Sequence, residues 1–239
     1  MVSNITYRFS TFSDYSVLTY NKDDVIRILT DFEGVNLAPA IIQEIMPLGI
    51  PNQRMQFMAQ NGLLLITISS ERIDIQLTSD RKEGFDQKGI DDIKDKMVSY
   101  MTKLTDIFSD RVALPYRLAW FTSYVYFDQS KEEKDAYRDR FLKDIEYFKD
   151  NRLDDMMARF GTQRKVIISN QEEMINVILT VNRHITDKGT DNEVDGYKAD
   201  FDINTWQGKR INRFDKDTYE EFIGKAIEEQ VKLKEEVMV

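Results

Sequence analysis

The sequence predicts an α+β fold with a curved antiparallel sheet and helices on one side of it. Three observations indicate this class: several segments alternate polar and apolar residues, an Asn-Gly pair joins two of them, and long amphipathic segments follow the strand-rich regions. The order strand, helix, three or four antiparallel strands, long helix occurs twice. We therefore expect two pseudo-repeated units, residues 1–110 and 111–239, which can pack as one globular body.

The first unit is expected to open with one or two strands within residues 3–20 and a helix capped by Asn21. A hairpin is expected at Asn61-Gly62, the dipeptide that favours two-residue turns. In residues 72–78 the odd positions are apolar and the even positions polar, so one sheet face should be buried and the other polar. The other elements expected are strands at 54–60 and 63–69 and a helix at 88–108. Residues 39–46 fit a strand or a short helix, because so short an apolar run has no clear period, and we favour the strand.

The second unit is expected to begin with an aromatic, β-branched interior strand at 114–127. A charged helix follows at 131–148, with a second short helix extending to Phe160. The remaining elements are strands at 165–169, 174–185 and 197–204 and an amphipathic helix at 216–237. The repeat is expected in the order of the elements and not in their residues.

Composition restricts the classes of function. The chain has no cysteine, which excludes disulfides, thiolate zinc sites and cysteine nucleophiles. A net charge of -9 disfavours bulk nucleic-acid binding. The nearest approach to a basic patch is Lys209, Arg210 and Arg213, which we expect to be a solvated loop. No basic and apolar leader opens the chain and no apolar run is long enough to span a bilayer, so we expect a cytoplasmic protein without a membrane partner.

Two resemblances follow from this layout. Two such units resemble the duplicated fold of the TATA-binding protein, whose curved sheet carries paired long helices on its convex side. That family binds DNA through a basic surface, and this acidic chain has no matching positions, so no DNA-binding residues are carried over. The stretch Met55 to Gln76, the aromatic strand and Ala199 to Asn204 resemble a sporadically distributed prokaryotic family of uncharacterised proteins. That resemblance implies no particular chemistry.

The densest group of polar residues lies in the last two expected strands. If 174–185 and 197–204 form an antiparallel hairpin, their even-numbered faces coincide. This places Asn182 near Asp200, His184 near Lys198 and Thr180 near Asp202. The candidate ligand-binding residues are therefore His184, Asn182, Lys198, Asp200 and Asp202. A solvated polar sheet face is the simpler interpretation.

The loop before the last strand has a weak likeness to an EF-hand. Asp191, Glu193 and Asp195 fall at positions 1, 3 and 5 of that register, with Gly196 and Asp202 at positions 6 and 12. Position 3 is Glu, position 12 is not the bidentate Glu, and strands flank the loop. We therefore favour an acidic loop and no metal site.

No nucleophile elbow, P-loop or dinucleotide fingerprint occurs in the chain. The leading hypothesis is a binding module that engages a protein or small-molecule partner without catalytic machinery or cofactor. The alternative is a divalent-cation-assisted hydrolase that uses His184, Asp200 and Asp202. A third hypothesis is a subunit of a homo-oligomer.

Overall fold

The computed structural model describes residues 2–45, 49, 51–79, 87–126, 130, 132, 139, 155–191 and 193–238. Within these residues the chain forms one nine-stranded antiparallel sheet and three helices. The expected α+β class is therefore confirmed. The sheet is open, because its two edge strands do not pair with each other.

The strands are β1 (Val2–Phe12), β2 (Leu37–Ile45), β3 (Pro51–Ala59), β4 (Leu64–Ile68), β5 (Arg72–Thr78), β6 (Arg117–Tyr126), β7 (Met157–Ile168), β8 (Gln171–Thr186) and β9 (Val194–Thr205). The helices are α1 (Lys22–Asp31), α2 (Gln87–Phe108) and α4 (Thr218–Met238). Their order in the sheet is β2-β3-β4-β5-β1-β6-β9-β8-β7, so β1 and β6 pair near its middle. The sheet is continuous across the expected boundary at residue 110.

Two local signals in the first half have their expected effect. The side chain of Asn21 accepts a hydrogen bond from the backbone N–H of Asp23 at 2.8 Å and caps α1. The Asn61-Gly62 pair joins β3 to β4, with Gly62 at a φ of +71°, a conformation that favours glycine. The predicted hairpin and helix start are both confirmed.

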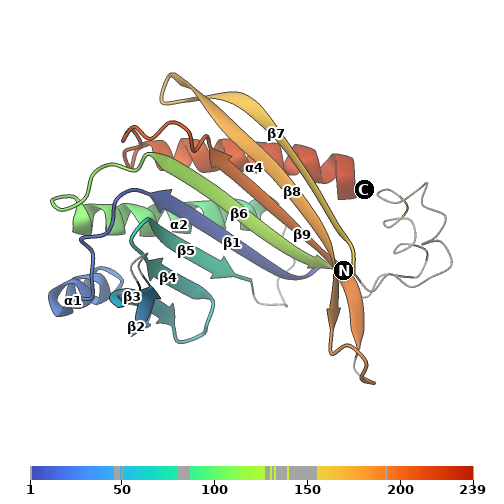
Figure 1. Ribbon diagram of the computed structural model, residues 1–239, viewed down its shortest axis with the longest axis horizontal. Coiled ribbons are helices and arrows are strands. Elements are labelled where there is room, and N and C mark those ends of the chain that lie inside the picture. The colour runs from blue at the N-terminus through green and yellow to red at the C-terminus, as the bar shows by residue number, and fades with distance from the viewer. Residues whose placement is uncertain are drawn as a thin grey trace.

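The core lies between one face of the sheet and the two long helices (Figure 1). Phe9 of β1 contacts Tyr219 and Phe222 of α4, with ring centroids 5.4 and 6.3 Å apart. On the same face of β1, Thr11 donates a hydrogen bond to the sulfur of Met101 in α2. The odd-numbered residues of β5 are buried on this face, as their alternation predicts.

β6 lies between β1 and β9, which confirms the expected interior strand. β7 corrects the expectation that a short helix extends to Phe160 and that strands return only at residue 164. It begins at Met157 and pairs with β8 along its whole length. Gly161 is a poor helix residue, and a continuous ladder outweighs local helical spacing. The helix expected at 131–148 lies outside the described residues except for positions 132 and 139.

A buried arginine, Arg54, and a half-buried one, Arg213, hold loops in place by ion pairs. Arg54 of β3 has no exposed surface, pairs with Glu44 at 2.7 Å and donates to the carbonyls of Ser16 and Leu18. Burial alone would raise the pKa of Glu44, but hydrogen bonds from Ser70 and Arg54 outweigh it and lower that pKa. This contact fixes the segment between β1 and α1.

The second ion pair corrects part of the expectation of a solvated loop: Arg210 is exposed as expected, but Lys209 and Arg213 are half-buried against Glu173. Arg213 donates from Nε and Nη2 to the buried carboxylate of Glu173, at 2.8 and 3.0 Å, and Lys209 donates to the same group at 2.8 Å. Burial raises the pKa of Glu173, but these two cations outweigh it and lower that pKa. The acidic partner of Lys209 and Arg213 is thus Glu173 of β8, and not one of the aspartates that flank them in the sequence.

Candidate functional site

The face of the sheet opposite the long helices is the candidate site. In Figure 1 both long helices lie behind the sheet, and β1 and β6 run across the middle of the face that points toward the viewer. The side chains on this face come from the even-numbered residues of β1, β5, β8 and β9 and the odd-numbered residues of β6. Among the described elements, the two long helices leave this face uncovered. A polar sheet face can bind a ligand or remain solvated, and the residues that line it decide between these two roles.

The residues proposed from the sequence lie on this face, but in a different register. The pairs directly opposite each other are Thr180 with Asp200, Asn182 with Lys198 and His184 with Gly196. The expected register is therefore wrong by two residues, while the shared face is as expected. β8 continues to Thr186 and β9 begins at Val194, so both strands are longer and the connection between them is shorter than the expected strands 174–185 and 197–204 indicated.

In this register the proposed residues lie at successive positions along β8 and β9 and do not form one cluster. Lys198 forms an ion pair with Asp200 at 3.0 Å, and Asn204 donates to Asp202 at 2.9 Å. His184 lies opposite Gly196, four residues from Asp200, which is about 13 Å along a strand. The structure therefore does not bring His184 into contact with these two aspartates.

The EF-hand-like register does not form a loop around a central point. From Val194 onward the chain is strand β9, so positions 5 to 12 are extended. Asp195 is bound by Arg183 through two hydrogen bonds of 2.9 and 2.6 Å, and Glu193 accepts from the backbone of Gly189 at 2.8 Å. Within the described ranges no three or more His, Asp or Glu side chains gather as metal ligands.

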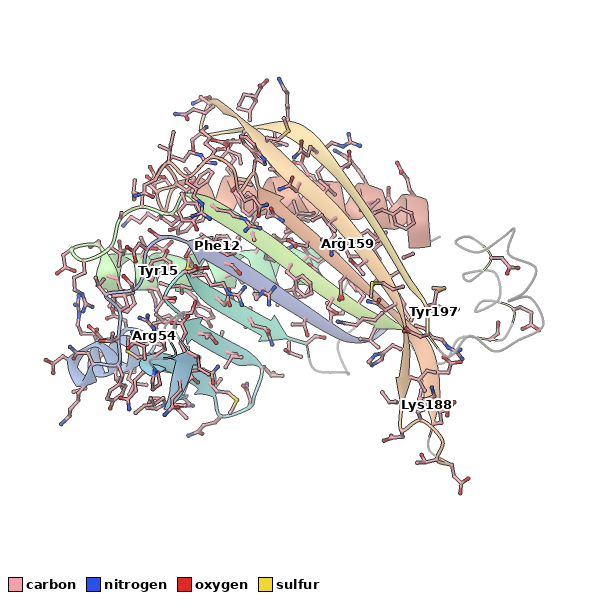
Figure 2. All side chains as sticks on the ribbon, in the orientation of Figure 1. Phe12, Tyr15, Arg54, Arg159, Lys188 and Tyr197 are labelled. Carbon is pink, nitrogen blue, oxygen red and sulfur yellow. The ribbon has the colours of Figure 1, made fainter. Side chains whose placement is uncertain are left out.

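Sequence reasoning missed the four large side chains at the centre of the face. Arg8 of β1 lies opposite Phe121 of β6, and Phe12 of β1 lies opposite Arg117 of β6. The guanidinium of Arg8 sits 4.7 Å from the centroid of the Phe121 ring, and that of Arg117 sits 4.6 Å from the Phe12 ring. These are two cation–π contacts between neighbouring strands. Figure 2 marks Phe12 at the end of β1.

The two guanidinium groups lack the acceptors that arginine normally has. The Nε atoms of Arg8 and Arg117 are buried without a hydrogen-bond partner, and no described carboxylate forms an ion pair with either group. Burial lowers the pKa of Arg117, and Arg72 acts in the same direction, whereas Asp202 opposes the shift. An unpaired buried donor costs about 1–3 kcal/mol, and a cation–π contact offsets about 0.5–2 kcal/mol of that.

Between the two cation–π pairs lie two small residues. Ser10 and Ala119 are opposite each other and only 3% and 8% exposed. The longer side chains on either side of them account for this low exposure. Ser10 donates to Asp74 at 2.6 Å, and Asp74 also pairs with Arg72 at 2.9 Å. The carboxylate of Asp74, beside the Ser10–Ala119 pair, is therefore already bound by Ser10 and Arg72.

The charges of the face do not cancel at this centre. Asp74 and Asp200 each have a basic partner, Arg72 and Lys198. Asp202 accepts from Asn204 and contributes a favourable field to Arg117 without an ion pair. A chain of net charge -9 thus holds two cations on the same pair of strands, and no described carboxylate forms an ion pair with either. This arrangement favours a small anion at short range.

A sequence signal for these residues does exist. Arginine precedes phenylalanine by four residues in both Arg8 to Phe12 and Arg117 to Phe121, and both segments lie in predicted strands. Residues four apart in a strand point to the same face. Only the pairing of β1 with β6, which are more than a hundred residues apart, brings the two segments together.

Comparison with known proteins adds no family to this description. No protein-family model matches the chain, and no curated protein sequence matches it. In the described part of the chain no helix is long and apolar enough to cross a membrane. The geometry of the open face is therefore the basis on which a function can be inferred.

Proposed function

We propose that the protein is a binding module that takes a small anionic ligand on the open face of its sheet. The observation that carries the proposal is the pair of partly buried guanidinium groups, Arg8 and Arg117, which have ring partners but no acceptors. A planar guanidinium matches carboxylate and phosphate oxygens, and a partly desolvated one binds them more strongly than an exposed one does. The expected ligand chemistry is therefore a carboxylate or phosphate ester.

The charge of the whole chain favours a small ligand over a polyanion. At physiological salt the field of an exposed charge is screened within about 8 Å, so a small anion at the centre responds mainly to the two arginines. A long phosphate backbone would also lie against the acidic remainder of a chain whose net charge is -9. A small molecule is for this reason the better fit to the face.

We also propose that residues 1–110 and 111–239 descend from one duplicated unit. The strand order supports this: it runs β1-β5-β4-β3-β2 outward from the centre on one side and β6-β9-β8-β7 on the other. Both series end in a long helix against the same face, α2 and α4, which contact each other through Thr105 and Tyr219 at 3.1 Å. The proposed binding centre then lies at the junction of the two units.

Calorimetric titration with two probes, hexanedioate and inorganic pyrophosphate, tests the proposed function. The wild-type protein is compared with the Arg8→Gln/Arg117→Gln double variant and with Arg159→Gln. Arg159 is exposed on β7 and serves as a matched control for the loss of one positive charge (Figure 2). Hydrogen bonds to charged groups contribute about 1.5–3 kcal/mol each, so the double variant should lose at least about tenfold in affinity.

The titration has three outcomes that decide the proposal. Binding of either probe that the double variant loses and Arg159→Gln retains supports it. A loss in the double variant that is only twice that of the control, in free energy, would be the same effect per removed charge; it would show only a general charge effect and would overturn the proposal. The absence of binding for both probes at millimolar concentration would also overturn it. Circular dichroism of each variant checks that the fold is intact.

A further inference from the structure

The two strands that carry the arginines share a residue pattern as well as a place in the fold. Tyr7 to Tyr15 reads Tyr-Arg-Phe-Ser-Thr-Phe-Ser-Asp-Tyr, and Tyr116 to Tyr124 reads Tyr-Arg-Leu-Ala-Trp-Phe-Thr-Ser-Tyr. Both fit Tyr-Arg-x-x-x-Phe-(Ser/Thr)-x-Tyr. This corrects the expectation that the repeat has no counterpart in the residues. The pattern marks β1 and β6 as equivalent strands of the proposed duplication.

The antiparallel register of β1 and β6 places these equivalent segments about an approximate two-fold axis. Ser10 and its counterpart in the pattern, Ala119, lie directly opposite each other. An axis through this pair exchanges Arg8 with Arg117 and Phe12 with Phe121. Each guanidinium therefore rests on the phenylalanine of the other copy of the pattern. The face holds two equivalent half-sites, each built from both strands.

The symmetry extends outward along the same row of the sheet. Gln56 of β3 donates to Thr67 of β4 at 3.1 Å, and on the other side Gln163 of β7 donates to Asn176 of β8 at 3.0 Å. These four residues lie in register with Ser10 and Ala119 through the intervening strands. The equivalence of the two half-sites thus rests on more than the central strands.

The spacing of the half-sites sets the size of the ligand. Arg8 and Phe12 are four residues apart on β1, which is about 13 Å along a strand. Each arginine rests on the residue opposite it, so the two guanidinium groups lie at opposite ends of this interval. Each phenylalanine ring lies beneath a guanidinium group at one end, and between the two ends are Ala119 and the hydroxyl of Ser10, which already donates to Asp74. The middle of the site carries no unpaired charge.

We infer that the ligand is an elongated dianion with one anionic group at each end and an uncharged middle. Arg8 binds one end and Arg117 the other, while the middle lies over the Ser10–Ala119 pair. This inference rests on the proposed function, because it assigns the same two arginines to one ligand. Two linked anions bind more tightly than two separate ones because the second contact forms within the complex.

A chain-length series tests the inference. Calorimetry measures the affinity of the wild-type protein for straight-chain α,ω-dicarboxylates from butanedioate to dodecanedioate, with the monocarboxylate of equal length as the control for each. Affinity should rise to a maximum at one length, where both ends reach an arginine, and then fall. At the maximum the dicarboxylate should bind about a hundredfold more tightly than its monocarboxylate.

The single variants Arg8→Gln and Arg117→Gln test the equivalence of the two ends. Each should reduce the affinity for the optimal dicarboxylate to that for the monocarboxylate, and the two losses should agree within about threefold. Arg159→Gln should leave the length profile unchanged. Both central variants remove only a cation–π contact and an unpaired donor, so both should remain folded.

The possible results separate this inference from the proposed function. A length optimum that both single variants abolish supports the two-ended ligand. Carboxylate binding without any dependence on length, or binding lost in only one of the two variants, overturns the two-ended ligand while the proposed anion-binding function stands. If no dicarboxylate or monocarboxylate binds, and pyrophosphate does not bind either, both are overturned.

Discussion

The arginines of the open face differ from the arginines that hold the loops in what replacement should do to stability. Arg117→Met keeps an unbranched side chain over the Phe12 ring but removes a buried Nε that has no acceptor. Relief of the unpaired donor should contribute about 1–3 kcal/mol, and loss of the cation–π contact should cost about 0.5–2 kcal/mol. The expected net effect on the free energy of unfolding is a gain of about 1 kcal/mol.

Arg213→Met is the matched opposite. It removes both guanidinium donors from the buried carboxylate of Glu173, which leaves only Lys209 as a charged partner. Breaking a buried ion pair from one side costs about 3–5 kcal/mol. Both variants remove one positive charge and introduce the same side chain, so the sign of the change separates an arginine held for binding from one held for structure.

Urea unfolding followed by circular dichroism measures this difference. For a chain of this size the slope is about 2–3 kcal/mol per molar, so Arg213→Met should lower the midpoint by more than about 1 M. Arg117→Met should raise the midpoint by a few tenths molar at most. If Arg117→Met destabilises the protein as strongly as Arg213→Met, the central arginines are structural and the reasoning from unpaired donors is refuted.

Three further outcomes follow from other contacts. Gln230→Ala should destabilise the protein by about 2–4 kcal/mol in urea, because Gln230 accepts from Trp120 and Thr122 and donates to Tyr124 in the core; a loss below 1 kcal/mol would contradict this. Glu173→Gln should flatten the acid unfolding curve. The lowered pKa of Glu173 gives stability above its ordinary value of 4.5 that is lost as the pH falls below it, so an unchanged curve would be the contrary result. Gly62→Ala should cost about 1 kcal/mol by thermal unfolding, because the turn needs a positive φ, and no change would exclude strain there.

Most single elements of this fold follow from local pattern. The alternation at residues 72–78 identified the buried face of β5, and the Asn-Gly pair identified the β3–β4 turn, because both signals depend on neighbouring residues only. The expectation of a helix as far as Phe160 is wrong for residues 157–160, where pairing with β8 overrides the local preference. The far end of this hairpin pairs Met157 with Asn182, and a window of neighbouring residues does not contain that partner.

The candidate site was harder to predict from the sequence, because it too depends on which strands pair and in what register. The shared face of β8 and β9 followed from alternation, but the register did not, since a slip of two residues keeps every side chain on its face. Arg8 and Arg117 are ordinary strand residues in the sequence. Their environment arises from the pairing of β1 with β6, and the pattern they share becomes visible once those strands are compared directly.

The most direct measurement of the central claim is a nitrogen-15 NMR titration of the arginine Nε–Hε groups with hexanedioate. The resonances of Arg8 and Arg117 are assigned by substituting each in turn. Both should shift along one common binding curve, because an anion bound to either guanidinium, neither of which has an acceptor, changes the electronic environment of its Nε–Hε group. The resonances of Arg54 and Arg213, which already bind carboxylates, should stay in place. Shifts confined to other arginines, with those of Arg8 and Arg117 unchanged at saturation, would contradict the account.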